Sequence, residues 1–280
     1  MRNPRRAVTP INAVAMNTAD VPTPDDPLLM FYVDSLRLLE ATGLPFAVGG
    51  AFAHSRYTGR DRDTKDLDVV LKRDDVPRAL SAFKEAGYEV ELPFPHWLGK
   101  VHRDGRYIDV VFSSGNGIVQ VDDCWFTCAV PSEVLGIPVL LCPAEELLWS
   151  SAFVQERERY DGAAVLHLLH ARALFLDWPR LLGRFGENWP VLLSYLVLFR
   201  FAYPDRRSDI PDDVMNELTA RMMAQTPEPA NPVCFGTLLS REQYLFDLDQ
   251  LGYTDARLQP HGEMTPEQAE IWTRAIGTRR

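Results

Sequence analysis

A glycine pair followed at short spacing by two alternating carboxylates constrains this chain more than any other feature. Gly49 and Gly50 come directly after a short apolar stretch, and Asp66 and Asp68 flank Leu67 further along the chain. Side chains on a strand alternate between its faces, so the two acids point one way and Leu67 points the other way, into the core. The pattern predicts a strand, a tight turn into a helix, and then a strand that carries two acids on one face.

A third carboxylate belongs to a predicted hairpin. The segments 99–103 and 106–112 flank Asp104-Gly105, a strong two-residue turn signal, and Asp109 lies in the second arm. If that arm pairs beside the strand predicted over 66–71, three carboxylates converge. Crowded carboxylates need a compensating cation, and hard oxygen ligands favour Mg²⁺ or Mn²⁺. Two-metal sites hold their ions about 3.5–4 Å apart.

The glycine pair suits the other end of a nucleotide. Without side chains at Gly49 and Gly50, backbone amides at the start of the following helix can approach phosphate oxygens, helped by the helix dipole. Each feature alone has a simpler explanation: a glycine pair can be a tight turn without a ligand, and an Asp-x-Asp can be a solvated strand edge. The combination, in this order, favours a site.

The same residues carry a family resemblance. The order Val48-Gly49-Gly50, Asp66-Leu67-Asp68 and Tyr107-Ile108-Asp109-Val110 resembles the DNA polymerase β-type nucleotidyltransferase superfamily, over roughly residues 28–141. Members transfer a nucleoside monophosphate from a triphosphate to an acceptor hydroxyl. The resemblance implies that Gly49 and Gly50 touch the triphosphate and that Asp66, Asp68 and Asp109 are catalytic and bind two metal ions.

The second half of the chain resembles uncharacterised bacterial nucleotidyltransferase-like proteins and, more distantly, abortive-infection toxin nucleotidyltransferases. The segments that carry this resemblance are 143–149 and 157–161. Relatives usually have a lysine in the first helix of this region. The matching stretch here, Trp149-Ser150-Ser151-Ala152-Phe153, has none.

Basic residues near these motifs are candidates for phosphate binding. Lys65, directly before the paired acids, and Arg157, after the first helix of the second half, are predicted to bind nucleotide; Arg159 and Asp161 lie beside Arg157. A solvated helix end explains 157–161 equally well. The residues flanking the acids form a possible basic rim, or else a generic charged surface: Arg60, Arg62, Lys65, Lys72, Lys100, His102, Arg103 and Arg106.

The chain divides by character into three parts. Residues 1–27 lack periodicity and are predicted to be a disordered tail, residues 28–141 a nucleotidyltransferase-like domain, and residues 142–280 a helical domain. The fold class is therefore α+β, with a nucleotidyltransferase-type mixed sheet and flanking helices before an all-helical C-terminal domain. The helices expected in the second half span 144–157, 162–174, 179–185, 190–201, 212–223 and 241–251.

Composition narrows the setting. A net charge of −10 over 280 residues excludes a surface that is a nucleic-acid footprint as a whole. Cys124, Cys128, Cys142 and Cys234 do not form paired zinc-binding motifs and are expected to be reduced thiols in or near the core. No export signal and no membrane span is predicted, which favours a cytoplasmic protein. Only four of the 29 basic residues are lysines, a bias that suggests a GC-rich bacterial genome.

Together these features predict a magnesium- or manganese-dependent nucleotidyltransferase whose partners are a nucleoside triphosphate and an acceptor hydroxyl. The sequence does not distinguish a small molecule, a protein side chain or an RNA end as acceptor. The alternative is a non-catalytic nucleotide-binding or toxin–antitoxin partner protein with the same fold.

Overall fold

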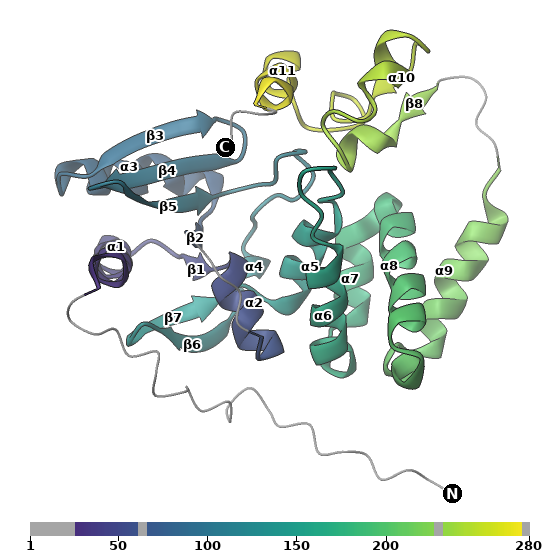
Figure 1. Cartoon of the computed structure of the whole chain (residues 1–280), viewed down its shortest axis with the longest axis horizontal. Coiled ribbons are helices and arrows are strands. Elements are labelled where there is room, and N and C mark those ends of the chain that lie inside the picture. Colours follow the sequence, from purple (N-terminus) through teal and green to yellow (C-terminus); the bar gives the residue numbers. More distant parts are fainter. Residues whose placement is uncertain (1–25, 61–65, 227–231, 276–280) are drawn as a thin grey trace, which may run out of the picture.

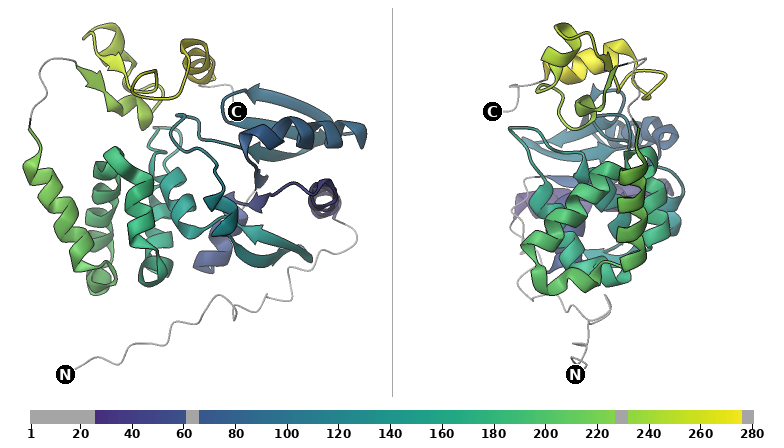
Figure 2. Two further views of the ribbon diagram at one scale, coloured as in Figure 1. Left: turned by 180° about the vertical axis from the view of Figure 1, so that it is seen from behind. Right: turned by 90° about the vertical axis from the view of Figure 1, so that its right-hand side faces the viewer.

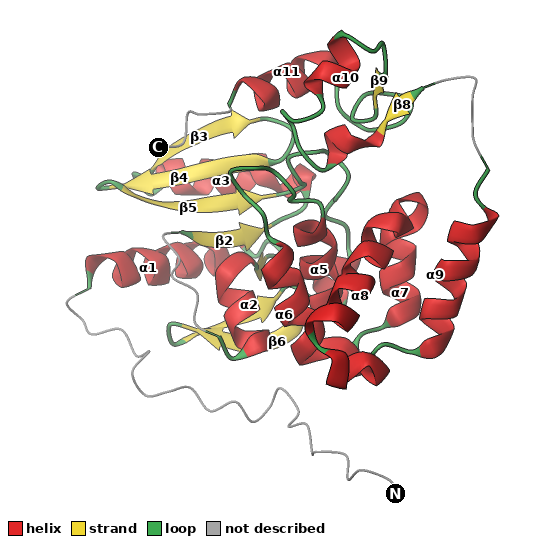
Figure 3. Cartoon of the chain, turned by 45° about the vertical axis from the view of Figure 1, so that its right-hand side comes forward, coloured by secondary structure: helices red, strands yellow, loops and turns green. Residues whose placement is uncertain are grey.

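The structure, a computed structural model, describes residues 26–60, 66–226 and 232–275. It is an α+β protein built on a seven-stranded mixed sheet with the strand order β3-β4-β5-β2-β1-β7-β6 (Figures 1 and 3). The strands are β1 (Ala47–Val48), β2 (Leu67–Val70), β3 (Glu89–Phe94), β4 (Leu98–Arg103), β5 (Arg106–Val111), β6 (Val130–Val134) and β7 (Ile137–Leu141). The α+β class is confirmed.

Parallel and antiparallel pairs are mixed in the sheet. β2 pairs in parallel with β5, and β1 in parallel with β7. The other neighbours, β1–β2, β3–β4, β4–β5 and β6–β7, are antiparallel. Asp104 and Gly105 both take positive φ, 53° and 73°, in the two-residue turn between β4 and β5, so the predicted hairpin is confirmed.

Three helices accompany the strands in the first half of the chain. α1 (Pro27–Thr42) begins where the Asp26 carboxylate accepts the backbone N–H of Leu28, and it ends at Gly43 in the left-handed region with φ 66°. α2 (Gly50–Thr58) connects β1 to β2, and α3 (Val76–Glu85) precedes β3. A single-turn helix, α4 (Cys124–Thr127), follows β5.

A layer of helices forms the second half and lies on the right in Figure 1 (see also Figure 2). It contains α5 (Ala144–Ala152), α6 (Gly162–Arg172), α7 (Trp178–Phe185), α8 (Trp189–Ala202) and α9 (Asp212–Ala224). Short 3-10 turns link several elements: η3 (Arg73–Asp75), η4 (Ala173–Phe175), η5 (Gly186–Asn188), η6 (Pro204–Asp209) and η7 (Phe235–Leu238). None of the helices in the described ranges has the length and apolarity needed to cross a membrane.

The last described segment returns to the sheet. It contains a two-stranded parallel sheet of β8 (Val233–Cys234) and β9 (Thr254–Asp255), with α10 (Leu245–Asp249) between these strands in the chain and α11 (Pro266–Arg274) after them. α11 packs against β3, the strand at one end of the large sheet (Figure 1). Its Trp272 ring meets the rings of Phe94 and Trp97 edge-on, with centroids 4.9 and 5.2 Å away.

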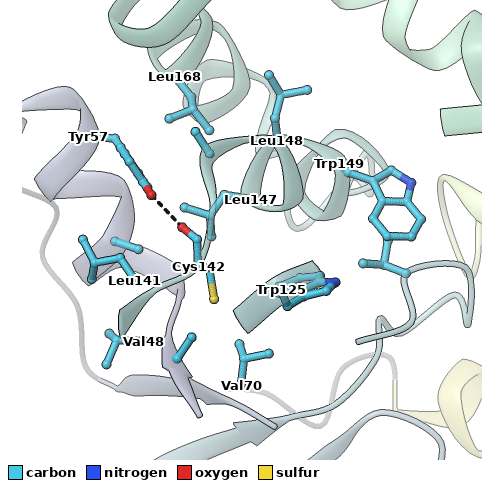
Figure 4. Packing of buried hydrophobic residues seen from close by; sticks show 14 of the residues in the cluster. Val48, Tyr57, Val70, Trp125, Leu141, Cys142, Leu147, Leu148, Trp149 and Leu168 are labelled. Carbon is cyan, nitrogen blue, oxygen red and sulfur yellow. Dashed lines mark hydrogen bonds between the residues drawn. The ribbon is translucent and has the colours of Figure 1, made fainter. Parts of the chain in front are cut away.

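One continuous apolar core joins the sheet to the helical layer (Figure 4). Val48 of β1, Leu141 of β7 and Leu148 of α5 are fully buried in it. The Tyr57 hydroxyl at the end of α2 donates a hydrogen bond of 2.9 Å to the Cys142 carbonyl oxygen, which ties α2 to the start of the helical layer.

Several predicted boundaries change. The helix predicted over 144–157 ends at Ala152, because the next residues form a tight loop in which the Asp161 N–H donates to the Val154 carbonyl oxygen and Gln155 bridges to Tyr160. The helix predicted over 241–251 shortens to α10, and α11 was not predicted. Residues 1–25 of the predicted tail lie outside the described ranges, and the division at residue 141 stays a prediction.

Candidate functional site

Asp68 and Asp109 lie side by side on the sheet. They are register partners in the parallel pair of β2 and β5, and the partners before them, Leu67 and Ile108, are fully buried. Because side chains alternate along each strand, both carboxylates project from the face opposite to those apolar residues. Asp66 directly precedes β2, two residues before Asp68. The structure therefore brings the predicted acids together.

The crowding is visible in the acid-base behaviour of Asp68. Its pKa rises to about 7 from an ordinary 3.8, chiefly because burial disfavours the charged carboxylate and then because Asp66 and Asp109 repel it. Arg159 and Lys100 oppose the rise. Like charges that share one site raise the pKa of a carboxyl group among them. A bound cation would relieve the repulsion between Asp68 and its two acidic neighbours.

The glycine pair lies against the Asp68 carboxylate. Gly49 precedes α2, and its N–H donates a 3.0 Å hydrogen bond to the Asp68 carbonyl oxygen. Gly50 has a φ of 52°, a region that disfavours residues with side chains. A Cβ on Gly50 would stand 1.7 Å from Asp68 Oδ2. Gly50 is thus required twice, by its backbone conformation and by the carboxylate that lies at the start of α2.

Lys100 holds the third acid. It is the register partner of Asp109 across the antiparallel pair of β4 and β5, and its Nζ forms an ion pair with Asp109 Oδ1. Both side chains are largely withdrawn from water, at 17% and 10% exposure. The ammonium also lies over the Tyr107 ring, 4.0 Å from its centroid.

The donor set fits a divalent cation only in part. Asp66 and Asp68 offer hard carboxylate oxygens that repel one another, which suits Mg²⁺ or Mn²⁺. Asp109 is already paired with Lys100. Within the described ranges, no group of three or more histidine, cysteine, aspartate or glutamate side chains is arranged to hold a metal ion.

The structure describes only some of the cations that were predicted to bind nucleotide. Lys65 lies outside the described residues, as does Arg62 of the predicted rim. Arg157 is exposed in the loop that follows α5, and no ion pair is found for it within the described residues. Arg159, in the same loop, acts on Asp68 by lowering its pKa, and it pairs with Asp161 at 3.2 Å. The charge of Arg159 therefore acts on Asp68, while its ion pair is with Asp161.

Other members of the predicted basic rim have partners of their own. Lys72 forms a 2.9 Å ion pair with Asp123, and His102 Nε2 lies 2.9 Å from a Glu91 carboxylate oxygen. Arg103 donates to the Ala86 carbonyl oxygen. Among the rim residues that the structure describes, Lys100 is the one that forms an ion pair with an acid of the site.

Tyr32 was not assigned to the site from the sequence, and the pairing of Lys100 with Asp109 was not predicted. Tyr32 of α1 is 1% exposed, and its hydroxyl has no hydrogen-bond partner among the described residues. Burial and the charges of the nearby acids, Asp66 first, raise the pKa of Tyr32, which places its hydroxyl near the site. Apolar residues at helical spacing around Tyr32 in the sequence indicate only that it is buried. Lys100 had a usable signal, because a two-residue turn at Asp104-Gly105 already sets Lys100 opposite Asp109.

No protein-family model matches the sequence, and no curated protein sequence matches it. Three solved structures to which the chain is similar are a nucleotidyltransferase-like protein from Paracoccidioides brasiliensis, the lincosamide antibiotic adenylyltransferase LnuA with lincomycin bound, and the Megavirus polyadenylate synthase. All three of these proteins are nucleotidyltransferases or nucleotidyltransferase-like proteins by name.

These similarities are low in sequence. The Paracoccidioides protein is 15% identical, covering 65% of this chain and 91% of that chain, with a TM-score of 0.42. LnuA is 15% identical, covering 52% and 98%, with a TM-score of 0.38. The polyadenylate synthase is 11% identical, covering 74% and 52%, with a TM-score of 0.37.

Proposed function

We propose that the protein is a nucleotidyltransferase that moves a nucleoside monophosphate from a nucleoside triphosphate to an acceptor hydroxyl. The observation that carries the proposal is the register pairing of Asp68 with Asp109, with the Gly50 turn at the start of α2 pressed against Asp68. Two acids on one face beside a helix start combine a cation site with an anion site, and a metal-bound triphosphate needs both.

The residues divide into two roles. Asp66 and Asp68 would hold a magnesium or manganese ion, and Asp109 would join them only after leaving Lys100. When bound, the ion supplies charge neutralisation for the triphosphate and favours ionisation of the acceptor hydroxyl. The backbone amides that follow Gly49 in α2 would donate to phosphate oxygens.

Cations around the acids complete the proposed nucleotide site. Arg159 lowers the pKa of Asp68 through its charge and can pair with a phosphate. Lys65 and Arg157, predicted from the sequence, stay part of this proposal. The proposal also includes a cytoplasmic location, a bacterial source and a dependence on a divalent metal ion.

The acceptor stays open between a small hydroxyl compound, a protein side chain and an RNA end. The net charge of −10 favours an acceptor that is not a long polyanion, since the protein as a whole repels one. Among the neighbours, LnuA is an antibiotic adenylyltransferase. A small hydroxyl compound is accordingly the first acceptor class to test.

A second function is favoured by one observation. The pairing of Asp109 with Lys100 neutralises an acid that a two-metal enzyme needs. A protein that binds a triphosphate without transferring it, such as a toxin–antitoxin partner, is consistent with that pairing.

The deciding experiment incubates the protein with Mg²⁺ and each labelled nucleoside triphosphate, alone and with pooled small hydroxyl compounds, protein or RNA. We expect label transfer and pyrophosphate release with one acceptor class. Asp68→Asn should abolish both, whereas Asp34→Asn, an exposed change on α1, should leave both intact. A melting temperature that rises with Mg²⁺ and a triphosphate, without transfer to any acceptor, would favour the binding protein instead.

A further inference from the structure

A cavity lies near the end of α2 that is remote from Gly50. It has a volume of about 170 Å³ and is bounded by Tyr57 of α2, the start of α5, the end of α6 and the segment that leads from α4 into β6. Gly50 begins α2, and Tyr57 lies about 10 Å further along the helix axis. The three acids and two glycines of the proposed nucleotide site, all of which the structure describes, do not line this cavity. It is therefore a separate concave site.

Arg172, the last residue of α6, brings a positive charge to the cavity wall without an anionic partner. Its Nε atom is buried without a hydrogen-bond partner, and its side chain forms no ion pair within residues 26–60, 66–226 and 232–275. The guanidinium lies over the Phe175 ring at 4.8 Å and over the Tyr57 ring at 5.6 Å. These rings attract the charge but do not replace the hydrogen bonds of water. Burial accordingly lowers the pKa of Arg172.

The other polar groups at the cavity are already occupied. Glu145 Oε1 accepts the Asp177 backbone N–H at 2.7 Å, and Glu145 Oε2 pairs with Arg180. The Tyr57 hydroxyl donates to a backbone carbonyl oxygen (Figure 4). The charged lining residues are Glu145, Arg172 and Arg180, so the lining has a net charge of +1. The N–H groups of Arg172 are the donors left for a ligand.

We propose that this cavity binds a small organic anion with a single carboxylate, which pairs with the Arg172 guanidinium. A guanidinium presents parallel N–H groups in the geometry that a carboxylate accepts. One unpaired positive charge matches one negative charge, whereas Glu145 at the same wall would repel a phosphate that carries a second charge. The inference goes beyond the proposed function and does not rest on it.

The size and the walls of the cavity suit such a ligand. A water molecule occupies about 30 Å³ of liquid, so the cavity has the volume of about six waters, enough for a small carboxylate such as butyrate or benzoate. Val130, Phe175 and Leu176 give part of the wall an apolar surface that the organic part of the ligand can contact. Apolar walls with one well-placed polar group are typical of small-molecule sites.

Ligand-observed NMR on the full chain tests the class of ligand. Acetate, butyrate and benzoate are titrated separately, each against its uncharged amide, with inorganic phosphate as a competitor. We expect saturable binding of butyrate or benzoate, and at least tenfold weaker binding of the matching amide. The inference is overturned if none of the three carboxylates binds, if carboxylate and amide bind equally, or if phosphate binds more tightly than the carboxylates.

Variants of Arg172 locate the binding. Arg172→Gln should weaken carboxylate binding at least tenfold, and Arg172→Lys, which keeps the charge but loses the paired N–H groups, should have an intermediate effect. Arg37→Gln, an exposed change on α1, is the matched control and should bind like the parent. Because Arg172 has no anionic partner among the described residues, Arg172→Gln should keep or raise the ligand-free melting temperature. A folded Arg172→Gln that binds like the parent would overturn the inference.

Cys128 gives a second readout that needs no variant. Its thiol is exposed, and the residue lines the cavity. On freshly reduced protein from which the reductant has been removed, the carboxylate that binds should slow alkylation of Cys128 by iodoacetamide at least threefold, while its amide should not. Cys234, which does not line the cavity, is the internal control in the same mass spectra. If Arg172→Gln does not fold, this measurement decides, and unprotected Cys128 at saturating carboxylate would overturn the inference.

Discussion

The carboxylates of Asp68 and Asp109 project from directly opposed positions on two parallel strands, with a fully buried leucine and isoleucine one residue before them. Like charges so placed destabilise a protein unless a cation compensates them. Lys100 compensates Asp109, whereas Asp68 keeps a carboxyl group that ionises with difficulty. This asymmetry makes the site testable by stability as well as by activity.

Asp68→Asn should stabilise the metal-free protein at alkaline pH. The folded-state pKa of Asp68, about 7, lies above its ordinary 3.8, so ionisation favours the unfolded chain, and the parent loses stability as pH rises through 7. Asparagine does not ionise. We expect urea unfolding at pH 8 to show a gain on the order of 3–4 kcal/mol, nearly vanishing at pH 4. Added Mg²⁺ should reverse the order by stabilising the parent alone. A variant less stable than the parent at pH 8 without metal would contradict this.

Gly50→Ala should destabilise the fold even without nucleotide. The new Cβ would stand 1.7 Å from Asp68 Oδ2, at a φ of 52°. We expect a loss of at least about 2 kcal/mol in unfolding free energy. Gly49→Ala is the matched control and should cost less, since its Cβ would stand 3.3 Å from Val70 Cγ2. Adding Asp68→Ala to Gly50→Ala should restore part of the loss. No restoration would mean that backbone strain alone explains the glycine.

Tyr32→Phe should leave stability unchanged or slightly higher. The Tyr32 hydroxyl is buried without a hydrogen-bond partner among the described residues, so its removal ends a desolvation cost. Its place near the acids makes it a donor for a bound ligand, so triphosphate affinity should fall by about tenfold, the worth of one hydrogen bond to a charged group. Thermal melting and equilibrium dialysis with a triphosphate give the two readouts. Unchanged affinity would assign Tyr32 to the core alone.

Cys124 and Cys128 should form a disulfide under mild oxidation. Their Sγ atoms lie 3.2 Å apart across α4, Cys128 is exposed, and both thiols are free. Peroxide would oxidise one thiol, and the second would displace water to close the bond. Mass spectrometry should show a loss of about 2 Da that maps to this pair. Cys142, which is fully buried, should stay reduced under the same conditions. Oxidation that persists in Cys128→Ser with the same mass change would contradict the pairing.

His96→Gln should reduce the acid sensitivity of the fold. Burial is the chief cause that lowers the pKa of His96 to about 4 from an ordinary 6.5, so protonation favours the unfolded chain. The parent therefore loses stability as pH falls from 6.5 towards 4. We expect the loss of unfolding free energy between pH 7 and pH 4 to be about 1–3 kcal/mol smaller in the variant. His102→Gln, at a partly exposed position, is the control.

How far the sequence predicts the site depends on the range of each interaction. The phase of Asp66 and Asp68 is a local property of one strand, and the place of Asp109 follows from a two-residue turn, so both were predictable. The pairing of Lys100 follows from the same turn and could have been predicted. Tyr32 could not, because its approach to the acids depends on how α1 packs against distant strands.

The loop after α5 is a second part of the site that the sequence did not predict. The helix predicted over 144–157 would have placed Arg157 at its last residue, whereas the helix ends at Ala152. The helix instead ends where a local bridge between Gln155 and Tyr160 satisfies the backbone, and that turn brings Arg159 to bear on Asp68. The position of one helix end therefore explains why Arg159, and not the predicted Arg157, acts on Asp68. Helix ends are the boundaries that a sequence predicts least well.

The packing of Trp272 on Phe94 sets an order of events during synthesis. β3 forms one end of the sheet, and the helix that packs against it lies almost 180 residues further along the chain. At roughly 5–20 residues per second, a ribosome needs about 10–35 s to make that distance. During this interval β3 has its neighbours β4 and α3 but lacks its contact with α11, and an exposed edge strand can pair with another nascent chain. Aggregation of newly made protein, and its suppression by slower initiation or by chaperones, is where this late contact should show itself.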